Sequence, residues 1–181
     1  VTATGDVCVA ATNSGDLIVD EEIRSSAGNV AAYAFGNVNL RDGGPNTGGQ
    51  IRSDAAAGVA SVVAQNGAIQ DNRVSVAPEA DVQANSVVLV AGTDIGAALN
   101  PVEIDATDLA GRATNGMANI DDVAGGVTVT SVSTLACGDF PATPINGVSA
   151  TGNVCVAATN SGDLNILQDI VSTGANVAVY A

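Results

Sequence analysis

The chain has no histidine, no lysine and no tryptophan, and its only basic residues are five arginines. The absence of histidine removes the most common metal ligand and general base. Nucleic acids are bound through clustered lysine and arginine, and anionic lipid surfaces attract the same residues, so neither is an expected partner. The 19 acidic side chains, which give a net charge of -14, strengthen both exclusions.

Aromatic residues are also scarce, since two phenylalanines and two tyrosines make up 2% of the sequence. Apolar residues nevertheless reach 46%, carried mainly by alanine and valine. A disordered chain combines high charge with low hydrophobicity, so this composition predicts a folded protein whose backbones approach one another closely. No apolar run approaches the ~18 residues of a spanning helix, and we expect no membrane insertion in this segment.

A long internal repeat is the most informative feature that is present. The stretch VCVAATNSGDL occurs at residues 7–17 and again at 154–164, and a shift of 147 positions aligns 1–34 with 148–181 at 22 identical pairs of 34. Such self-similarity is typical of repeat proteins. The sequence therefore predicts one continuous segment over 1–181, with a full long repeat over 1–147 and the start of the next over 148–181. The alternative is a complete protein whose matching ends allow copies to stack.

A shorter period lies inside the long repeat. Glycine, then Asp or Asn, then an apolar residue recurs at Gly5-Asp6-Val7, Gly15-Asp16-Leu17, Gly28-Asn29-Val30 and Gly36-Asn37-Val38. Apolar residues after these turns alternate with a period of two, which is typical of strands. Equivalent turns lie about 21 to 23 residues apart, and a rung of about 21 residues would divide the long repeat into seven.

These patterns predict an all-β fold, a parallel β-helix (β-solenoid) in which short strands bury their apolar faces by stacking rung on rung. Glycine and Asn/Asp are expected at corners that need positive φ or side-chain-to-backbone bonds. At about 4.8 Å per rung, seven rungs would extend about 34 Å. A β-sandwich is the alternative fold.

The segment from Asp81 to Asp122 resembles the haemagglutinin-type repeats of filamentous haemagglutinin and its large relatives. The similar pieces are an apolar strand at Val87–Val90, a corner at Thr93–Gly96 and an Asn-Pro-hydrophobic step at Asn100–Val102. The resemblance implies that the β-helix is right-handed. It also implies a long secreted or surface-tethered protein, extracellular or at the cell surface, that acts as a fibre or an adhesin stalk.

Three cysteines are present, and Cys155 is the copy of Cys8. Cys137 and Cys155 lie 18 residues apart, close to one rung, which favours a disulfide between them and leaves Cys8 to pair with a cysteine of a preceding repeat. If Val154 and Val156 face inward, Cys155 faces outward, whereas Cys137 shares its parity with Leu135, which indicates the opposite face unless a bulge intervenes. The alternative is a pair of small buried thiols.

The sequence offers no catalytic, cofactor-binding or metal-binding residues. The acidic groups Asp20-Glu21-Glu22 and Asp121-Asp122 are interpreted as solvated corners, and GGPNTGG at 43–49 as a loop without the lysine of a phosphate site. Residues 40–50, 71–80 and 139–149 are rich in turn residues and are expected to protrude as loops.

We therefore expect a protein without enzymatic activity and without cofactors. It would be a structural subunit or segment of an extracellular or cell-surface fibre built by axial stacking of β-helix repeats. Its partner would be itself, through head-to-tail continuation and lateral bundling. Two alternatives remain: an adhesin stalk or binding module that contacts a receptor, a glycan or a neighbouring cell, and a carbohydrate-active β-helix enzyme.

Overall fold

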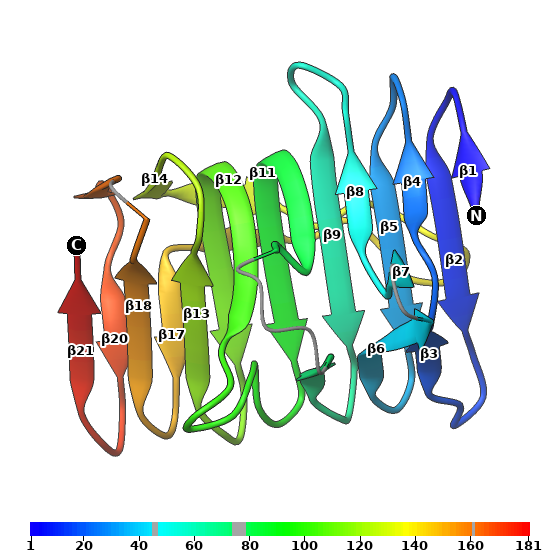
Figure 1. The fold of residues 1–181 in the computed structure, drawn as a ribbon. Coiled ribbons are helices and arrows are strands. Elements are labelled where there is room, and N and C mark those ends of the chain that lie inside the picture. Colours follow the sequence, from blue (N-terminus) through cyan, green and yellow to red (C-terminus); the bar gives the residue numbers. More distant parts are fainter. Residues whose placement is uncertain (45–46, 74–78, 161) are drawn as a thin grey trace.

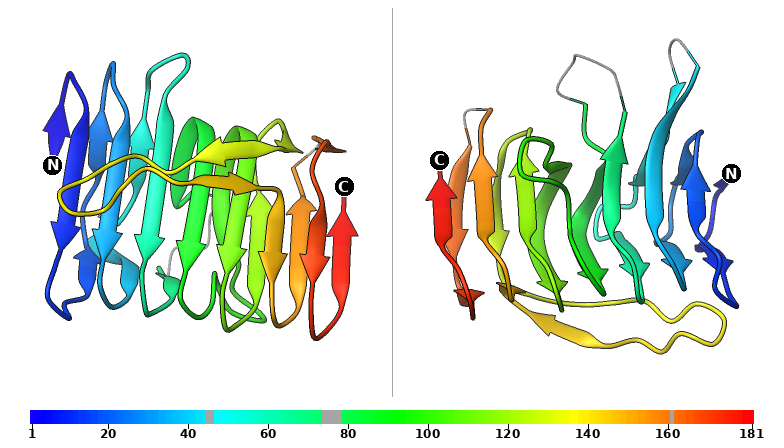
Figure 2. Two further views of the ribbon diagram at one scale, coloured as in Figure 1. Left: turned by 180° about the vertical axis from the view of Figure 1, so that it is seen from behind. Right: turned by 90° about the horizontal axis from the view of Figure 1, so that it is seen from below.

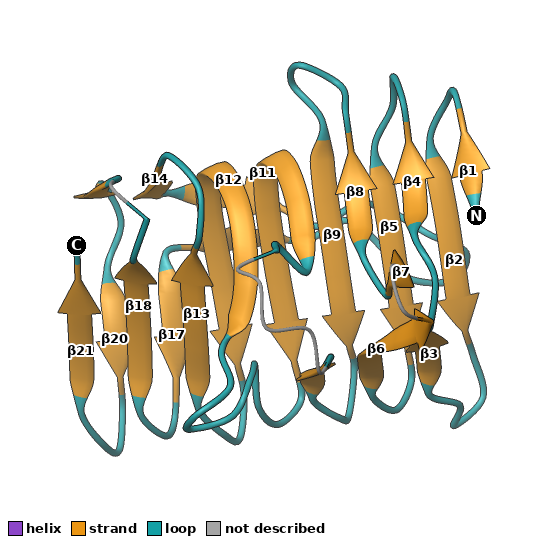
Figure 3. Ribbon diagram, viewed as in Figure 1, coloured by secondary structure: helices purple, strands orange, loops and turns teal. Residues whose placement is uncertain are grey.

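A computed structural model describes residues 1–44, 47–73, 79–160 and 162–181. Throughout these ranges the chain forms strands and connecting turns, as predicted, and no helix occurs (Figure 3). Within the same ranges there is accordingly no helix with the length and hydrophobicity needed to cross a membrane. Most strands pair in parallel, and the two ends of the chain lie at opposite ends of the molecule (Figure 1).

The strands form rows in which each member pairs in parallel with a later part of the chain. The first row runs from the N-terminal to the C-terminal end of the molecule. It contains β1 (Thr2–Ala3), β4 (Ile23–Ser25), β8 (Ile51–Ser53), the first parts of β11 (Val82–Ala91) and β12 (Val102–Ala113), then β13 (Ala118–Asp122), β18 (Val154–Ala158) and β21 (Val177–Tyr180).

The second row lies alongside the first, because the chain passes from one row to the other at each turn. It contains β2 (Val7–Ala11), β5 (Val30–Ala34), β9 (Val59–Ala64), the last parts of β11 and β12, then β14 (Gly126–Val129), β17 (Val148–Ala150), β19 (Asp163–Ile166) and β20 (Ile170–Ser172). A shorter third row contains β3 (Leu17–Val19), β6 (Val38–Gly44) and β10 (Ile69–Asn72).

Two strand pairs of the described ranges are antiparallel. β7 (Thr47–Gly48) folds back on β6, and β15 (Ser131–Ser133) pairs with β16 (Pro144–Asn146) to form a hairpin outside the rows. Apolar side chains from all three rows meet between them in one elongated core, with Val30, Leu89 and Ile120 fully buried. Small and β-branched residues fill this core because neighbouring strands lie only about 4.8 Å apart.

The expected spacing of about 21 residues is approached at some steps of the chain, among them β11 to β12, and fails at others. Val7 pairs with Val30 and Val154 with Val177, an offset of 23 residues in each copy of the repeat. Val30, however, pairs with Ala60, and Ala118 with Val154. Insertions between the strands, among them the β15–β16 hairpin, lengthen these steps, so the division of 147 residues into seven equal rungs is wrong.

The two copies of the repeated sequence also begin on different rows. β17 is the copy of β1, yet it pairs with the last part of β12 in the second row. β18 is the copy of β2, yet it pairs with β13 in the first row. In Figure 1 the arrows of β2 and β18 accordingly point in opposite directions. Five pairing steps lead from β2 to β17, and β18 follows half a circuit later.

The Gly-Asp/Asn-apolar motif has a steric explanation. Asp16 Oδ1 accepts the backbone N–H of Asn37 at 2.7 Å, and Asn37 Oδ1 accepts that of Ala68 at 2.9 Å. A Cβ on Gly67 would lie 2.5 Å from Asn37 Oδ1. The motif glycine therefore leaves room for the polar side chain of the turn before it. Of the two expected reasons for these corners, the side-chain-to-backbone bonds are confirmed, and positive φ occurs at other glycines, for instance Gly138.

Candidate functional site

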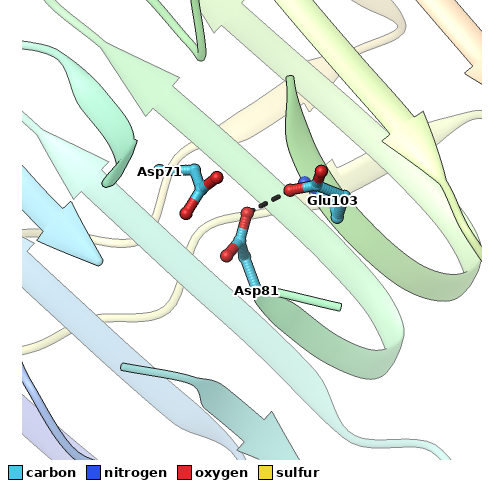
Figure 4. Close-up of side chains that lie close together, drawn as sticks. All are labelled: Asp71, Asp81 and Glu103. Carbon is cyan, nitrogen blue, oxygen red and sulfur yellow. Dashed lines mark hydrogen bonds between the residues drawn. The ribbon is translucent and has the colours of Figure 1, made fainter. Parts of the chain in front are cut away.

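Three carboxylates from different parts of the chain meet at one place, which we call the carboxylate cluster. Asp71 lies in β10, Asp81 directly precedes β11, and Glu103 lies in β12. One carboxylate oxygen of each lies within 4.8 Å of the others, and Figure 4 shows the three groups facing one another. Pairing of β11 with β12 fixes two of them, because the backbone N–H of Glu103 donates to Asp81 Oδ2 at 2.9 Å.

Arg73 supplies a positive charge inside the cluster. Its Nε lies 2.7 Å from Asp81 Oδ1 and 3.6 Å from Asp71 Oδ1, and the Arg73 and Asp81 side chains are almost completely buried. The contact with Asp81 is an ion pair whose angles are not those of a hydrogen bond. The guanidinium also donates to the carbonyl oxygen of Glu79. Arg73 therefore ties the two sides of the 74–78 segment to the strands.

Burial shifts the protonation of the cluster. Desolvation raises the pKa of Asp81 to about 9, although the charge of Arg73 opposes the shift. Desolvation also raises the pKa of Glu103. Burial thus favours the protonated form of these carboxyls, while the neighbouring Arg73 guanidinium favours the charged form of Asp81.

An oxygen-only group of ligands would suit a hard divalent cation. Calcium takes about six to eight oxygen ligands, however, and here the Arg73 guanidinium already neutralises part of the charge. Asn100 Nδ2 further occupies Asp71 Oδ2 at 2.9 Å. The arrangement is best explained as a structural charge cluster. Sequence reasoning missed it, because its members are distant in the chain and carry no motif.

The acidic groups selected from the sequence behave differently from one another. Asp20 and Glu21 are exposed, and Asp20 pairs with Arg41. The interpretation of Asp121-Asp122 as a solvated corner is wrong: Asp122 is 1% exposed and accepts the backbone N–H of Gly126 at 2.9 Å. It is buried because it bonds the backbone where the chain turns into β14, and burial raises its pKa to about 6.

The second candidate site is the β15–β16 hairpin. Its tip is a tight turn closed by backbone bonds between Cys137 and Phe140, with Gly138 at φ +59°. Figure 2 shows the hairpin lying along the outside of the second row, with its tip near the N-terminal end of the molecule. Of the loops expected to protrude, 139–149 includes half of this hairpin, whereas 40–50 and 71–80 fall partly outside the described residues.

A disulfide fixes the tip of the hairpin to the first strand of the second row. Cys137 is bonded to Cys8, with 5.6 Å between their Cα atoms, and the thiol of Cys155 is free. The expected pairing of Cys137 with Cys155 is therefore wrong. The prediction assumed that Cys137 lies within a rung, whereas the hairpin carries it back across several strands to β2. The expected outward direction of Cys155 is confirmed, since Val154 and Val156 enter the core.

The hairpin covers an apolar outer surface of the second row. Tyr33 of β5 stacks on Phe140 with 4.8 Å between ring centroids, and its hydroxyl donates to the carbonyl oxygen of Leu135. Strands β5 and β9 are apolar on both faces, a pattern of strands covered on both sides, and this signal in VAAYA and VASVVA could have predicted a covering element. Between hairpin and strands lies a cavity of about 220 Å³, with Arg112 at its wall.

Comparison of the chain with protein-family models, with curated proteins and with solved structures returned no match.

Proposed function

We propose that the chain is a segment of a right-handed parallel β-helix and that it serves as a structural part of an extracellular or cell-surface fibre. In this fibre, 147-residue units follow one another along the axis, and each strand pairs with the strand one turn later. The parallel rows and the transfer of the chain from row to row support the winding. Right-handedness rests on the general preference of crossover connections between parallel strands and on the resemblance to haemagglutinin-type repeats.

One observation carries this proposal: residues exposed on the last strand have buried equivalents in the first copy. Val179 is 42% exposed, whereas its equivalent, Ala32, is completely buried. Val177 is 45% exposed, whereas its equivalent, Val30, is completely buried by the strand that follows. The sequence of β21 is thus suited to having another strand beside it.

The first turn of the chain, in turn, lacks a neighbour that its equivalent in the second copy has. A Cβ on Gly5 would meet nothing within 4 Å, whereas on its equivalent, Gly152, it would lie 3.0 Å from the carbonyl oxygen of Gly116. The turn at 4–6 therefore has the sequence of a turn that packs against a preceding turn. Axial neighbours on both sides explain the two differences together, and such neighbours would be supplied by adjoining units of the fibre.

The proposed location rests on the covalent chemistry of the chain. A disulfide between Cys8 and Cys137 suits an oxidising environment, such as that outside the cell. The net charge of -14 would keep such a protein in solution before assembly. The proposal assigns neither a catalytic role nor a cofactor to the carboxylate cluster.

Cryo-electron microscopy and sedimentation of the purified chain test the proposal. We expect rods of constant width that lengthen with protein concentration, with strands stacked about 4.8 Å apart along the axis. Five and a half circuits at this spacing give about 26 Å per 147-residue unit, in place of the 34 Å expected from seven rungs.

A pair of lysine substitutions provides the matched comparison. Val179→Lys places a charge at the inner side of the terminal strand, where Val179 is 42% exposed, and should leave the chain monomeric. Leu99→Lys changes a side chain that is 98% exposed outside the strands and should leave rod formation intact. Rods formed equally by both variants, or a wild-type chain that remains monomeric at every concentration, would contradict axial stacking.

The cavity beneath the hairpin favours a second candidate function, an adhesive module. The cavity is smaller than the ~300 Å³ at which pockets for drug-sized ligands begin, so its ligand would be a small group. Arg112 at its wall would attract an acidic group, such as that of an acidic sugar. A glycan array should then show binding that Arg112→Ala abolishes. An array without binding would contradict this function and leave the fibre proposal in place.

A further inference from the structure

The surface that receives the hairpin tip in the first copy is small and well defined. It consists of outward-facing residues on two paired strands, Cys8 on β2 and Ala31 and Tyr33 on β5. Cys8 forms the disulfide with Cys137, and Tyr33 contacts both Phe140 and the Leu135 carbonyl. We call this surface the first docking patch.

The second copy of the repeat builds the same surface again. Cys155 lies on β18, and Ala178 and Tyr180 lie on β21, at positions shifted by 147 from the residues of the first patch. The register is also the same, because Cys155 pairs with Ala178 just as Cys8 pairs with Ala31. We call this surface the second docking patch.

The two patches differ in what covers them. The β15–β16 hairpin packs on the first patch and buries Tyr33 to 2% exposure. On the second patch Tyr180 is 60% exposed, and the thiol of Cys155 is free. A cysteine, an alanine and a tyrosine are thus repeated in identity and in register, and only the element that packs on them is missing from the second patch.

We propose that the second docking patch receives the tip of another hairpin of the 131–146 type, carried by the 147-residue unit that follows, and that Cys155 forms a disulfide with the equivalent of Cys137 in that hairpin. Each unit would then be closed by a covalent strap of its own, while strand pairing joins successive units axially. This inference rests on the proposed axial continuation of units.

The path of the observed hairpin agrees with this arrangement. The hairpin leaves the second row after β14, packs over β12, β11, β9 and β5, and returns to β17 (Figure 2). It therefore reaches back to the first strands of its own unit, and a following unit would reach back to β18 and β21 in the same way. Since β18 lies in the first row and β2 in the second, successive straps would lie on opposite sides of the molecule.

The bond itself requires a two-electron oxidation. The thiols of Cys155 and of the hairpin cysteine lose two protons and two electrons, and a disulfide donor takes these up and is reduced to two thiols. In a test, an activated hairpin cysteine replaces this oxidant. The Cys155 thiolate attacks the sulfur of the activated cysteine, the old disulfide breaks, and the leaving thiolate departs with the electron pair.

The experiment uses the full chain and a synthetic peptide of residues 130–147 whose cysteine is activated as a mixed disulfide with thionitrobenzoate. Release of thionitrobenzoate gives the rate, and peptide mapping identifies the cysteine that has reacted. A peptide of scrambled sequence with the same activated cysteine is the control. We expect the hairpin peptide to react at Cys155 about three- to tenfold faster than the control, the range that an aromatic contact supports.

Substitutions in each partner separate docking from plain thiol reactivity. Tyr180→Ala in the chain or Phe140→Ala in the peptide should lower the rate to that of the scrambled control, and Cys155→Ser should abolish labelling. Equal rates for the two peptides, no reaction at Cys155, or disulfide-linked chain dimers in place of the peptide adduct would overturn the proposal. If rods fail to form but peptide capture succeeds, the axial fibre is refuted while the docking patch stands, and the reverse result refutes only the strap.

Discussion

At the scale of single residues, the side chains at the turns control how closely the chain can stack on itself. Asp16 and Asn37 each accept a backbone N–H from a later turn, and glycine follows wherever such a side chain needs space. The motif that is visible in the sequence thus has one physical cause, a hydrogen bond from turn to turn that excludes a Cβ. The exception is Ala175, the equivalent of Gly28, which shows that the last turn tolerates a side chain.

Two alanine substitutions test whether the turns require this clearance. Gly67→Ala would place a Cβ 2.5 Å from Asn37 Oδ1 and should lower the free energy of unfolding by about 1 to 3 kcal/mol. Gly5→Ala would place the same atom in open space and should change it by about 0.5 kcal/mol or less. Urea denaturation measures both values, and equal losses would show that the turn does not depend on this clearance.

The buried carboxyl group of Asp81 predicts a pH dependence of stability. Its pKa is raised to about 9 in the folded chain, against about 3.9 in an unfolded one. Between these pH values the folded state holds the additional proton. The free energy of unfolding therefore falls as the pH rises, by at most about 1.4 kcal/mol per pH unit for one proton.

Asp81→Asn removes this titration while keeping the shape of the side chain. We expect the variant to lose stability less steeply than the wild type between about pH 5 and about pH 9, as followed by urea denaturation. Asp139→Asn, which removes a charge from an exposed position in the hairpin, should leave the slope unchanged. Parallel profiles for the wild type and Asp81→Asn would mean that Asp81 is ionised in the folded chain.

At the scale of elements, the hairpin links parts of the molecule that strand pairing leaves apart. Its disulfide joins residues separated by 129 positions, and its apolar face covers the outer surface of β5, β9, β11 and β12. The strands beneath it are consequently buried on both faces. The hairpin is therefore an integral part of the fold.

Cys8 and Cys155 are equivalent residues of the two copies, so the same substitution to serine at each position measures the contribution of the disulfide. Cys8→Ser opens the covalent loop and should lower the free energy of unfolding by up to about 4 to 5 kcal/mol, the value for a loop of this size in the chain-entropy model. Cys155→Ser changes the equivalent residue without breaking a bond and should have an effect of about 0.5 kcal/mol or less. Similar losses for the two variants would assign the effect to the side chain and not to the loop.

The all-β class, the parallel pairing and the outward face of Cys155 could be predicted from the sequence, because alternation and turn spacing act over a few residues. The partner of Cys137 could not, since it depends on the direction in which the 131–146 segment leaves the rows. The tight turn at Cys137–Phe140 and the doubly apolar VAAYA strand signal a hairpin and a covered surface. Neither says that the two belong together, and the carboxylate cluster likewise results from long-range pairing of strands.

At the scale of the whole molecule, charge opposes association while the exposed end strands favour it. Each 181-residue chain carries a net charge of -14, so chains repel one another. The repulsion acts over about 30 Å at 0.01 M salt but only about 8 Å at 0.15 M. Assembly should therefore depend on ionic strength even though the contact itself is mainly backbone pairing and apolar burial.

We expect the rods to lengthen when salt is raised from about 0.01 M to about 0.15 M, as measured by sedimentation, because screening weakens the repulsion between copies. Sucrose at matched osmolality should not reproduce the effect if it arises from charge. Longer rods at the lower salt concentration would instead indicate attraction between opposite charges at the ends of the copies.

The bond between Cys8 and Cys137 also determines how the chain responds to tension. A pull applied at its two ends passes through the sulfur atoms and bypasses the residues that the bond encloses. Only residues 1–7 and 138–181 can then be drawn out, to about 180 Å, whereas a fully released chain would extend to about 630 Å. A filament built of such units would release only the smaller part of its contour length under load for as long as its cystines remain oxidised.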